Sequence, residues 1–210
     1  MNRRITDQHF ASLVHGALPA DEAACVATYL QDLVQAAADD AANDDEPYGR
    51  DAHLRGRMSA LSVCDSLIRW TSGLELEVLV REELRAFEFG YATNIAVEGS
   101  PVRLRPDTGR FISLALHELT TNSIKFGMLG SLRGTARLHI GWTLQGDGLT
   151  LTWREEAVPI LAPLDARRKG FGQTFIQDIL PRQLGSVCTF ALLPGGVRCT
   201  LGLPASAFSE

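Results

Sequence analysis

The sequence predicts an α+β protein in which an N-terminal two-helix hairpin precedes a sandwich of mixed sheet and helices. Apolar residues recur at helical spacing up to Gly73, and beyond it strictly alternating segments are interspersed with helical ones. The chain has 210 residues, of which 45% are hydrophobic and 21% charged, as in ordinary globular proteins. We therefore expect two domains, a leader with a helical hairpin at 1–73 and a larger domain at 74–210.

The hairpin is predicted from two amphipathic segments joined by an acidic connection. The first covers about 21–42 and is alanine-rich, and the acidic stretch 39–47 ends it. The second covers about 50–71 and aligns Leu54, Met58, Leu61, the Cys64/Asp65 position and Ile68 along one face. Two helices alone leave both apolar stripes exposed, so we expect a homodimer in which two hairpins form a four-helix bundle.

The larger domain is predicted to combine helices with two strand hairpins. Strict alternation over 135–144 continues over 149–153 after the turn Gly146-Asp147-Gly148, which is typical of a hairpin. The remaining elements are expected as helices at 75–86, 106–128 and after Gly172, and as strands at 94–98, 187–192 and 197–203. Helices on one side of such a sheet make an α+β sandwich.

Composition excludes several classes of function. The net charge of −5 argues against nucleic-acid binding by a basic surface. No apolar run has the roughly 18–20 residues of a membrane span, and the N-terminus lacks the apolar core of a signal peptide. Four cysteines without CxxC spacing suggest neither zinc nor a redox pair. A cytoplasmic protein with reduced thiols is the simplest interpretation.

The segment from His117 to Gly127 is the most informative part of the chain. On a helix, Glu118, Asn122 and Lys125 share one face, while an apolar flank that includes Leu119 and Phe126 faces the core. A carboxylate, an amide oxygen for a hard cation and a phosphate-pairing amine together suggest Mg-nucleotide chemistry. Gly127 is expected to end the helix as a C-cap glycine.

Three blocks follow one another in order: His117–Gly127, Trp153-Arg154-Glu155 and Gly170-Phe171-Gly172. They resemble the N, G1 and G2 boxes of the GHKL (Bergerat) fold of histidine kinases. The chain is most similar to the HWE subfamily, named for a histidine in the N box and a Trp-x-Glu in the G1 box. The resemblance covers about 50–204 and implies a Bergerat-type sandwich that binds ATP and Mg²⁺.

The resemblance implies a role for each polar residue of the N box. Asn122 would coordinate the Mg²⁺ that bridges the ATP phosphates, with Glu118 nearby as a polarising or water-orienting carboxylate. Lys125 would pair with phosphate oxygens. His117 would either support the helix or touch the phosphates.

The G1 and G2 boxes would complete the nucleotide site. Glu155 would accept the exocyclic amine of adenine, and Trp153 would be a core aromatic or a ligand contact. Gly170, Phe171 and Gly172 would let backbone amides approach the phosphates.

A lid between the G1 and G2 boxes is expected to carry cations. Arg167, Arg168 and Lys169 would face the charge on the transferring phosphoryl group, unless this stretch is only a solvated loop.

The chain departs from the family in two places. The family's G1 box continues with two glycines, where this chain has Glu156, Ala157 and Val158 before Pro159. The phosphoacceptor histidine expected early in the first helix, near 27–30, is missing. His9 is the best remaining candidate, since His53 opens the second helix, the wrong place for the family's acceptor.

The leading hypothesis is a histidine kinase core that binds Mg-ATP, works as a dimer and transfers the γ-phosphate to a histidine, with a response regulator or a partner kinase as its partner. The first alternative is a non-catalytic adaptor that docks response regulators or partner kinases. The second is a serine kinase of the anti-sigma-factor type, against which the helical hairpin argues.

Overall fold

The structure is a computed structural model that describes residues 47–70, 74–90, 92–130, 135–158, 170–193 and 195–209. The chain divides into two compact units, Met1–Asp51 and Ala52–Glu210, and the contacts that build the site join residues of the second. The leader and the predicted first hairpin helix lie outside the described residues. The second helix is present as α3, Pro47–Trp70. The domain boundary between residues 73 and 74 stays a prediction.

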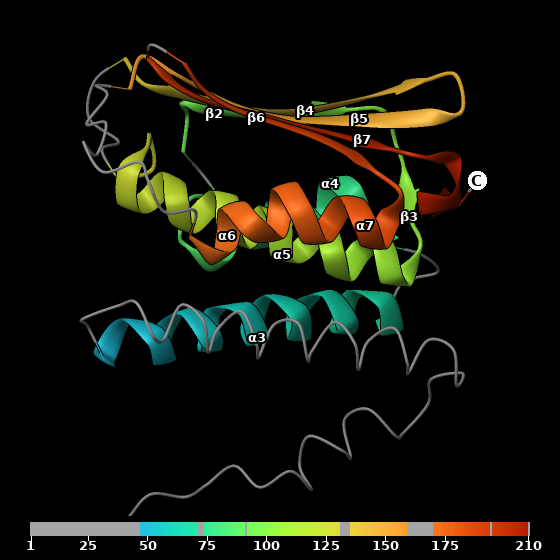
Figure 1. Cartoon of the computed structure of the whole chain (residues 1–210), viewed down its shortest axis with the longest axis horizontal. Coiled ribbons are helices and arrows are strands. Elements are labelled where there is room, and N and C mark those ends of the chain that lie inside the picture. Colours follow the sequence, from blue (N-terminus) through green and yellow to red (C-terminus); the bar gives the residue numbers. More distant parts are fainter. Residues whose placement is uncertain are drawn as a thin grey trace, which may run out of the picture. The chain divides into compact units, whose positions relative to one another are not determined.

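A five-stranded mixed sheet forms one layer of the second unit (Figure 1). Its strands, in the spatial order β2-β4-β5-β7-β6, are Ile95–Gly99, Arg137–Gln145, Gly148–Glu156, Gly196–Leu203 and Val187–Leu193. β2 and β4 are parallel, and all other neighbours are antiparallel. The two predicted hairpins are therefore confirmed as β4–β5 and β6–β7.

Helices lie against one face of this sheet (Figure 1), which confirms the α+β sandwich. They are α4 at Leu76–Ala86, α5 at Pro106–Phe126, and a continuous stretch that begins at Phe171, two residues before the predicted start. This stretch consists of α6 (Phe171–Thr174), a π-helical turn η1 (Phe175–Ile179) and α7 (Leu180–Leu184). The blocks on α5 and α6 thus belong to the helical layer, whereas Trp153 and Glu155 belong to β5 of the sheet.

A second, small sheet was not predicted. It joins β1 (Leu74–Glu75), β3 (Arg103–Leu104) and β8 (Phe208–Ser209) in antiparallel pairs, and a 3-10 turn, η2 (Ala205–Ala207), precedes β8. Two-residue strands carry no periodicity that a sequence could reveal.

The core lies between helix α5 and the inner face of the sheet. Alternate residues of β4 point inward, and Ile140 is 1% exposed, opposite Leu116 and Leu119 of α5. The expectation that Phe126 is buried with them is wrong, because this side chain is 66% exposed. Phe126 stands seven residues after Leu119 and so returns to the same helix face. Its exposure comes from its position as the last helical residue.

Helix α3 buries a different face from its apolar stripe. Arg57, Ala60 and Cys64 are buried, whereas Leu54 is 42% exposed and the rest of the stripe apart from Cys64, up to Ile68, is partly exposed. At 100° per residue the two faces are about a quarter turn apart. The described residues therefore cover the stripe only in part.

The turn after β5 keeps a glycine conformation without a glycine. Ala157 has a φ of 56°, in the left-handed region, and the Val158 N–H then donates to the carbonyl of Gly195 at 2.9 Å. A residue with a Cβ costs about 1–2 kcal/mol there. The alanine at this turn therefore carries backbone strain that a glycine would not.

Replacement of Ala157 by glycine should therefore stabilise the protein by about 0.5–1.5 kcal/mol, because the left-handed backbone costs glycine nothing. Urea unfolding followed by circular dichroism would measure the change. Ala96→Gly, at an exposed position in β2, is the control and should lose about 0.5–1 kcal/mol. Equal losses in both variants would contradict the assignment of strain to this turn.

Candidate functional site

Helix α5 presents the predicted polar residues on one face. It begins with Pro106 at a position that needs no N–H partner and with Asp107 in the first turn, near the positive end of the helix dipole. It stays helical to Phe126, so Glu118, Asn122 and Lys125 stand at i, i+4 and i+7. Their roles stay predictions, but their surroundings differ sharply.

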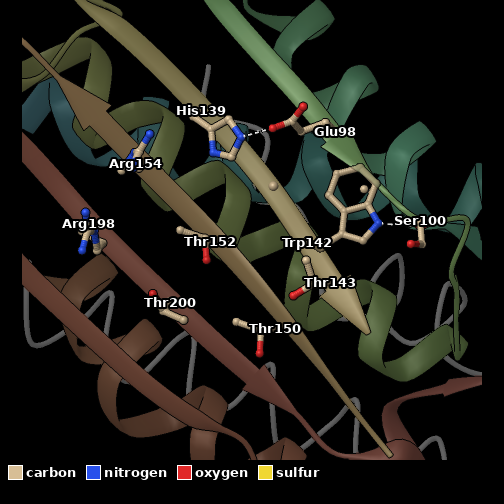
Figure 2. Close-up of a pocket in the computed structure, with 12 residues that line it drawn as sticks. Glu98, Ser100, His139, Trp142, Thr143, Thr150, Thr152, Arg154, Arg198 and Thr200 are labelled. Carbon is tan, nitrogen blue, oxygen red and sulfur yellow. Dashed lines mark hydrogen bonds and ion pairs between the residues drawn. The ribbon is translucent and has the colours of Figure 1, made fainter. Parts of the chain in front are cut away.

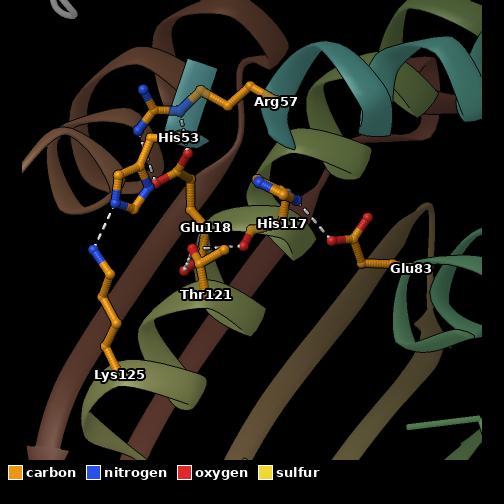
Figure 3. A network of polar contacts seen from close by, with 7 residues as sticks. All are labelled: His53, Arg57, Glu83, His117, Glu118, Thr121 and Lys125. Carbon is orange, nitrogen blue, oxygen red and sulfur yellow. Dashed lines mark hydrogen bonds and ion pairs between the residues drawn. The ribbon is translucent and has the colours of Figure 1, made fainter. Parts of the chain in front are cut away.

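Glu118 forms a buried ion pair with Arg57 of α3 (Figure 3). The Arg57 Nε donates to Glu118 Oε1 at 2.6 Å, and Nη2 lies 3.3 Å from Oε2. The two residues are 6% and 4% exposed. A buried pair of this kind compensates its desolvation only because both charges are present and hydrogen-bonded. Glu118 is thus held in one orientation by a residue of another helix.

The glycine-containing block packs on this ion pair. The Arg57 guanidinium lies 3.9 Å from the centre of the Phe171 ring, in a cation–π contact. A Cβ on Gly172 would come within 2.5 Å of Glu118 Oε2. The second glycine is therefore required for the close approach of α6 to a carboxylate. Helices α3, α5 and α6 meet at this point.

His117 points away from this cluster. Its Nδ1 donates to Glu83 Oε1 of α4 at 2.9 Å, and both side chains are buried. Its Nε2 faces α3, where a Cβ on Gly56 would lie only 2.6 Å away. Of the two roles that the resemblance implies for His117, this geometry favours support of the helix.

Asn122 and Lys125 stand at the accessible end of α5. Asn122 is half-buried, and its amide has no recorded hydrogen bond with any residue that the structure describes. Lys125 is exposed, and its Nζ lies 2.6 Å from Nε2 of His53, on α3 (Figure 3). An ammonium can only donate, so the Nε2 of His53 accepts and its Nδ1 carries the proton.

The charge state of His53 follows from its surroundings. Burial lowers its pKa below the ordinary value of 6.5, and the nearby cations Lys125 and Arg57 lower it further. Glu118 opposes this shift, and His117 adds to it. His53 is therefore neutral at pH 7.

Glu155 ties the end of β5 to the end of α5. Its Oε1 accepts from the indole N–H of Trp153 at 3.1 Å, and its Oε2 accepts from the backbone N–H of Met128 at 2.9 Å. Glu155 is 5% exposed and Trp153 is 2% exposed. Both G1 residues therefore belong to the buried framework around the site, and their contact with adenine stays a prediction.

Gly127 ends α5 as predicted, although for another reason. Its φ of −119° is not left-handed, so a C-cap conformation does not require the glycine. A Cβ there would lie 2.2 Å from Glu155 Oε2. The residue is a glycine because the carboxylate approaches the backbone closely.

The remaining predicted contacts concern the lid and the first glycine. Lys169 and its two arginine neighbours lie outside the described residues. Gly170 is exposed at the N-terminus of α6, and a Cβ there would meet no atom within 4 Å. Protein packing therefore does not explain the first glycine, and its predicted approach to phosphate stays open.

The outer face of the sheet carries a hollow of about 690 Å³ (Figure 2). Its lining is mostly small or polar and comes from four strands, with Thr143, Thr150, Thr152, Thr200, Arg154 and Arg198 among its residues. None of the predicted site residues lines it. It lies on the face that the helices leave uncovered.

Sequence reasoning missed three residues of the site: Arg57, Glu83 and His53. Arg57 lies in the second predicted helix, and it shares its helix face with Ala60 and Cys64. A charged residue among small ones on a buried face was the available signal. Nothing in the local sequence indicates its partner, which is 61 residues away.

No family model matches the chain. Among curated proteins it is similar to blue-light-activated histidine kinases. The match to the one from Rhizobium johnstonii is 29% identical over 147 residues and covers 68% of this chain and 40% of that protein. The match to blue-light-activated histidine kinase 1 of Erythrobacter litoralis is 28% identical over 113 residues and covers 53% and 31%. The chain spans less than half the length of these relatives.

Solved structures agree on the fold. The histidine kinase domain of a blue-light-activated histidine kinase from Erythrobacter litoralis matches with a TM-score of 0.62 at 15% identity, over 95% of this chain and 92% of that one. The chain is thus similar in sequence to histidine kinases and has the fold of a histidine kinase domain. The shared fold agrees with the α+β sandwich that the order of the three boxes predicted. A longer chain of the same protein matches with a TM-score of 0.56 at 17% identity, over 73% of this chain and 54% of that one.

The part of the chain that the structure describes contains neither a membrane-spanning helix nor a metal-binding group of acidic, histidine or cysteine side chains. No helix there is long and apolar enough to cross a membrane. No three histidine, cysteine, aspartate or glutamate side chains there gather into a group that could hold a metal ion.

Replacement of Arg57 by alanine should destabilise the protein by about 3–5 kcal/mol, because Glu118 would be left buried and unpaired. Urea unfolding would measure the loss. The control is Arg81→Ala, which breaks an exposed i,i+4 pair with Glu77 and should cost no more than about 0.5 kcal/mol. Similar losses in the two variants would contradict the inference that Glu118 depends on Arg57 because both are buried.

The lowered pKa of His53 predicts a specific pH dependence of stability. The unfolded chain, in which this histidine has its ordinary pKa of 6.5, binds a proton more readily than the folded chain. Stability should therefore fall as the pH drops through and below 6.5, and His53→Gln should lose less stability than the wild type between pH 7 and pH 5. The free energy of unfolding at a series of pH values measures this, and parallel curves would contradict it.

Proposed function

We propose that the chain is a two-component histidine kinase core that binds Mg-ATP on helix α5 and transfers the γ-phosphate to a histidine. The reaction class is supported by the histidine kinases to which the chain is similar. The position of the site is supported mainly by one observation. The face of α5 that carries Asn122 and Lys125 is also the face on which Gly172 packs, through Glu118.

The residues at this end of α5 fit magnesium and phosphate. The Asn122 amide oxygen is not used by any described residue and suits a hard cation that takes its other ligands from water and phosphate. The exposed ammonium of Lys125 suits the phosphate oxygens. Mg²⁺ would neutralise part of the negative charge on the ATP phosphates. Gly170, with no packing neighbour, and Lys169 of the lid would contact the same phosphates.

At the adenine end, Glu155 and Trp153 would form the floor of the pocket. The Glu155 carboxylate already accepts two N–H donors, and each of its oxygens has a second lone pair. The adenine amine would use one of these. Affinity for adenine would depend on the turn at Ala157, which has a left-handed backbone that glycine adopts without strain.

Dimerisation and signalling complete the proposal. Residues 1–73 would be the dimerisation and phosphotransfer domain and residues 74–210 the ATP-binding domain. Packing on α5 does not bury the apolar stripe of α3, since Leu54 is 42% exposed. A four-helix bundle would cover this stripe. The partner would be a response regulator, which accepts the phosphoryl group from the histidine.

Titration with Mg-ATP tests the proposal. Wild type should bind at micromolar to sub-millimolar concentration, and Asn122→Ala should bind at least about tenfold more weakly, a loss of about 1.4 kcal/mol. Gln145→Ala removes an exposed amide at the far end of β4 and should bind as wild type does. Isothermal calorimetry provides the comparison.

The outcomes separate the candidate functions. A wild type that binds no nucleotide would leave only the adaptor. Acid-stable phosphate on a serine of a partner protein would indicate a serine kinase instead.

A further inference from the structure

His53 lies where a phosphoryl group would be transferred. The sequence places it one helical turn before Arg57 on α3, and the fold brings its Nε2 to 2.6 Å from Lys125 Nζ. Its ring faces the accessible end of α5, close to Glu118 and Arg57 (Figure 3). A nitrogen atom of this histidine therefore sits beside the cation that is expected to hold phosphate.

The chemical state of this nitrogen suits nucleophilic attack. Because Lys125 can only donate, the Nε2 lone pair points toward the ammonium. Burial, together with the cations Lys125 and Arg57, lowers the pKa of His53, so the ring is neutral at pH 7. Only the neutral imidazole has a lone pair that can form a new bond. His53 combines that lone pair with partial exposure.

The other histidines of the described chain lack this combination. His117 is 4% exposed, with Nδ1 bound to Glu83 and Nε2 pressed against α3. His139 lies on the outer face of the sheet, where its Nε2 contacts Glu98 at 2.5 Å (Figure 2). His9 and His15 lie outside the described residues. A partly exposed ring beside Lys125 is therefore specific to His53 among the three that can be compared.

We propose that His53 is the phosphoacceptor of this chain and is phosphorylated on Nε2 by the nucleoside triphosphate bound at α5. The inference rests on the proposed function, because that site must supply the triphosphate. It places the modification on the second helix, which sequence reasoning had set aside.

The transfer balances without any further reactant. The Nε2 lone pair forms a bond to the γ-phosphorus, and the bond from this phosphorus to the β–γ bridging oxygen breaks. The bridging oxygen keeps the electron pair and leaves with the nucleoside diphosphate. The Nδ1 proton passes to water, so that the product is a neutral ring bearing a phosphoryl group.

The neighbouring residues have defined parts in this step. Lys125 would exchange its contact with Nε2 for the phosphoryl oxygens, which releases the lone pair as the phosphate arrives. Arg57, whose charge is already balanced by Glu118, keeps α3 against α5 and so holds His53 in place. Lys125 therefore contacts the acceptor nitrogen before the transfer and the phosphoryl oxygens during it.

The test uses the full chain with magnesium and γ-labelled ATP. Peptides are prepared at alkaline pH, which preserves phosphohistidine, and the site is located by mass spectrometry of the wild type. The expected result is phosphate on the peptide that contains His53. His53→Gln should lose the acid-labile, base-stable label and keep its Mg-ATP affinity, whereas His139→Gln should keep both.

Each outcome is decisive. ATP binding together with phosphate on another residue, or with no phosphate at all, would overturn the assignment of His53 and leave the nucleotide site standing. Absence of ATP binding in the wild type would remove the proposed function and this inference with it. Thermal unfolding of His53→Gln shows whether its loss of label comes from misfolding, and mapping on the wild type does not depend on any variant.

Discussion

The buried ion pair between Arg57 and Glu118 is the constraint on which the site depends. Both charges are almost fully removed from water, so neither is tolerable without the other. The pair forces α3 onto α5, and the contacts of Phe171 and Gly172 force α6 onto the same point. Three segments that are far apart in the sequence are thereby arranged around one carboxylate. This arrangement also brings His53 to Lys125.

A second buried carboxylate fixes the same helix to the sheet. Glu155 accepts N–H groups from Trp153 on its own strand and from Met128 just after α5. Removal of either donor would leave a buried lone pair unsatisfied, which is costly in a low-dielectric interior. Helix α5 is thus oriented at both ends of its polar face, and Asn122 between them is left without a partner among the described residues. A rigid helix with one unused oxygen is what a ligand-binding face requires.

The order of the elements was predictable because hydrophobic periodicity is a local property. Strict alternation identified β4 and β5, and the spacing of apolar residues identified α5 to within two residues of its end. The three polar residues on one face of α5 followed from helix geometry alone. Phe126 could not be placed correctly, since periodicity gives the face of a residue but not whether the sheet extends far enough to cover it. The two-residue strands of the small sheet were invisible for a related reason, because they exist only through their pairing.

The sequence by itself determined the secondary structure, the order of the three family-like blocks and the identity of the polar residues they carry, because these depend on neighbours a few positions away. Only the tertiary structure decided which of those residues are available to a ligand. Glu118, Glu155 and His117 are hydrogen-bonded to Arg57, Met128 and Glu83, whereas no residue that the structure describes is hydrogen-bonded to the Asn122 amide. Such pairings join residues that are 27 to 61 positions apart, and burial makes each one energetically decisive. No local pattern encodes them, so the chemistry of the site depends on the fold.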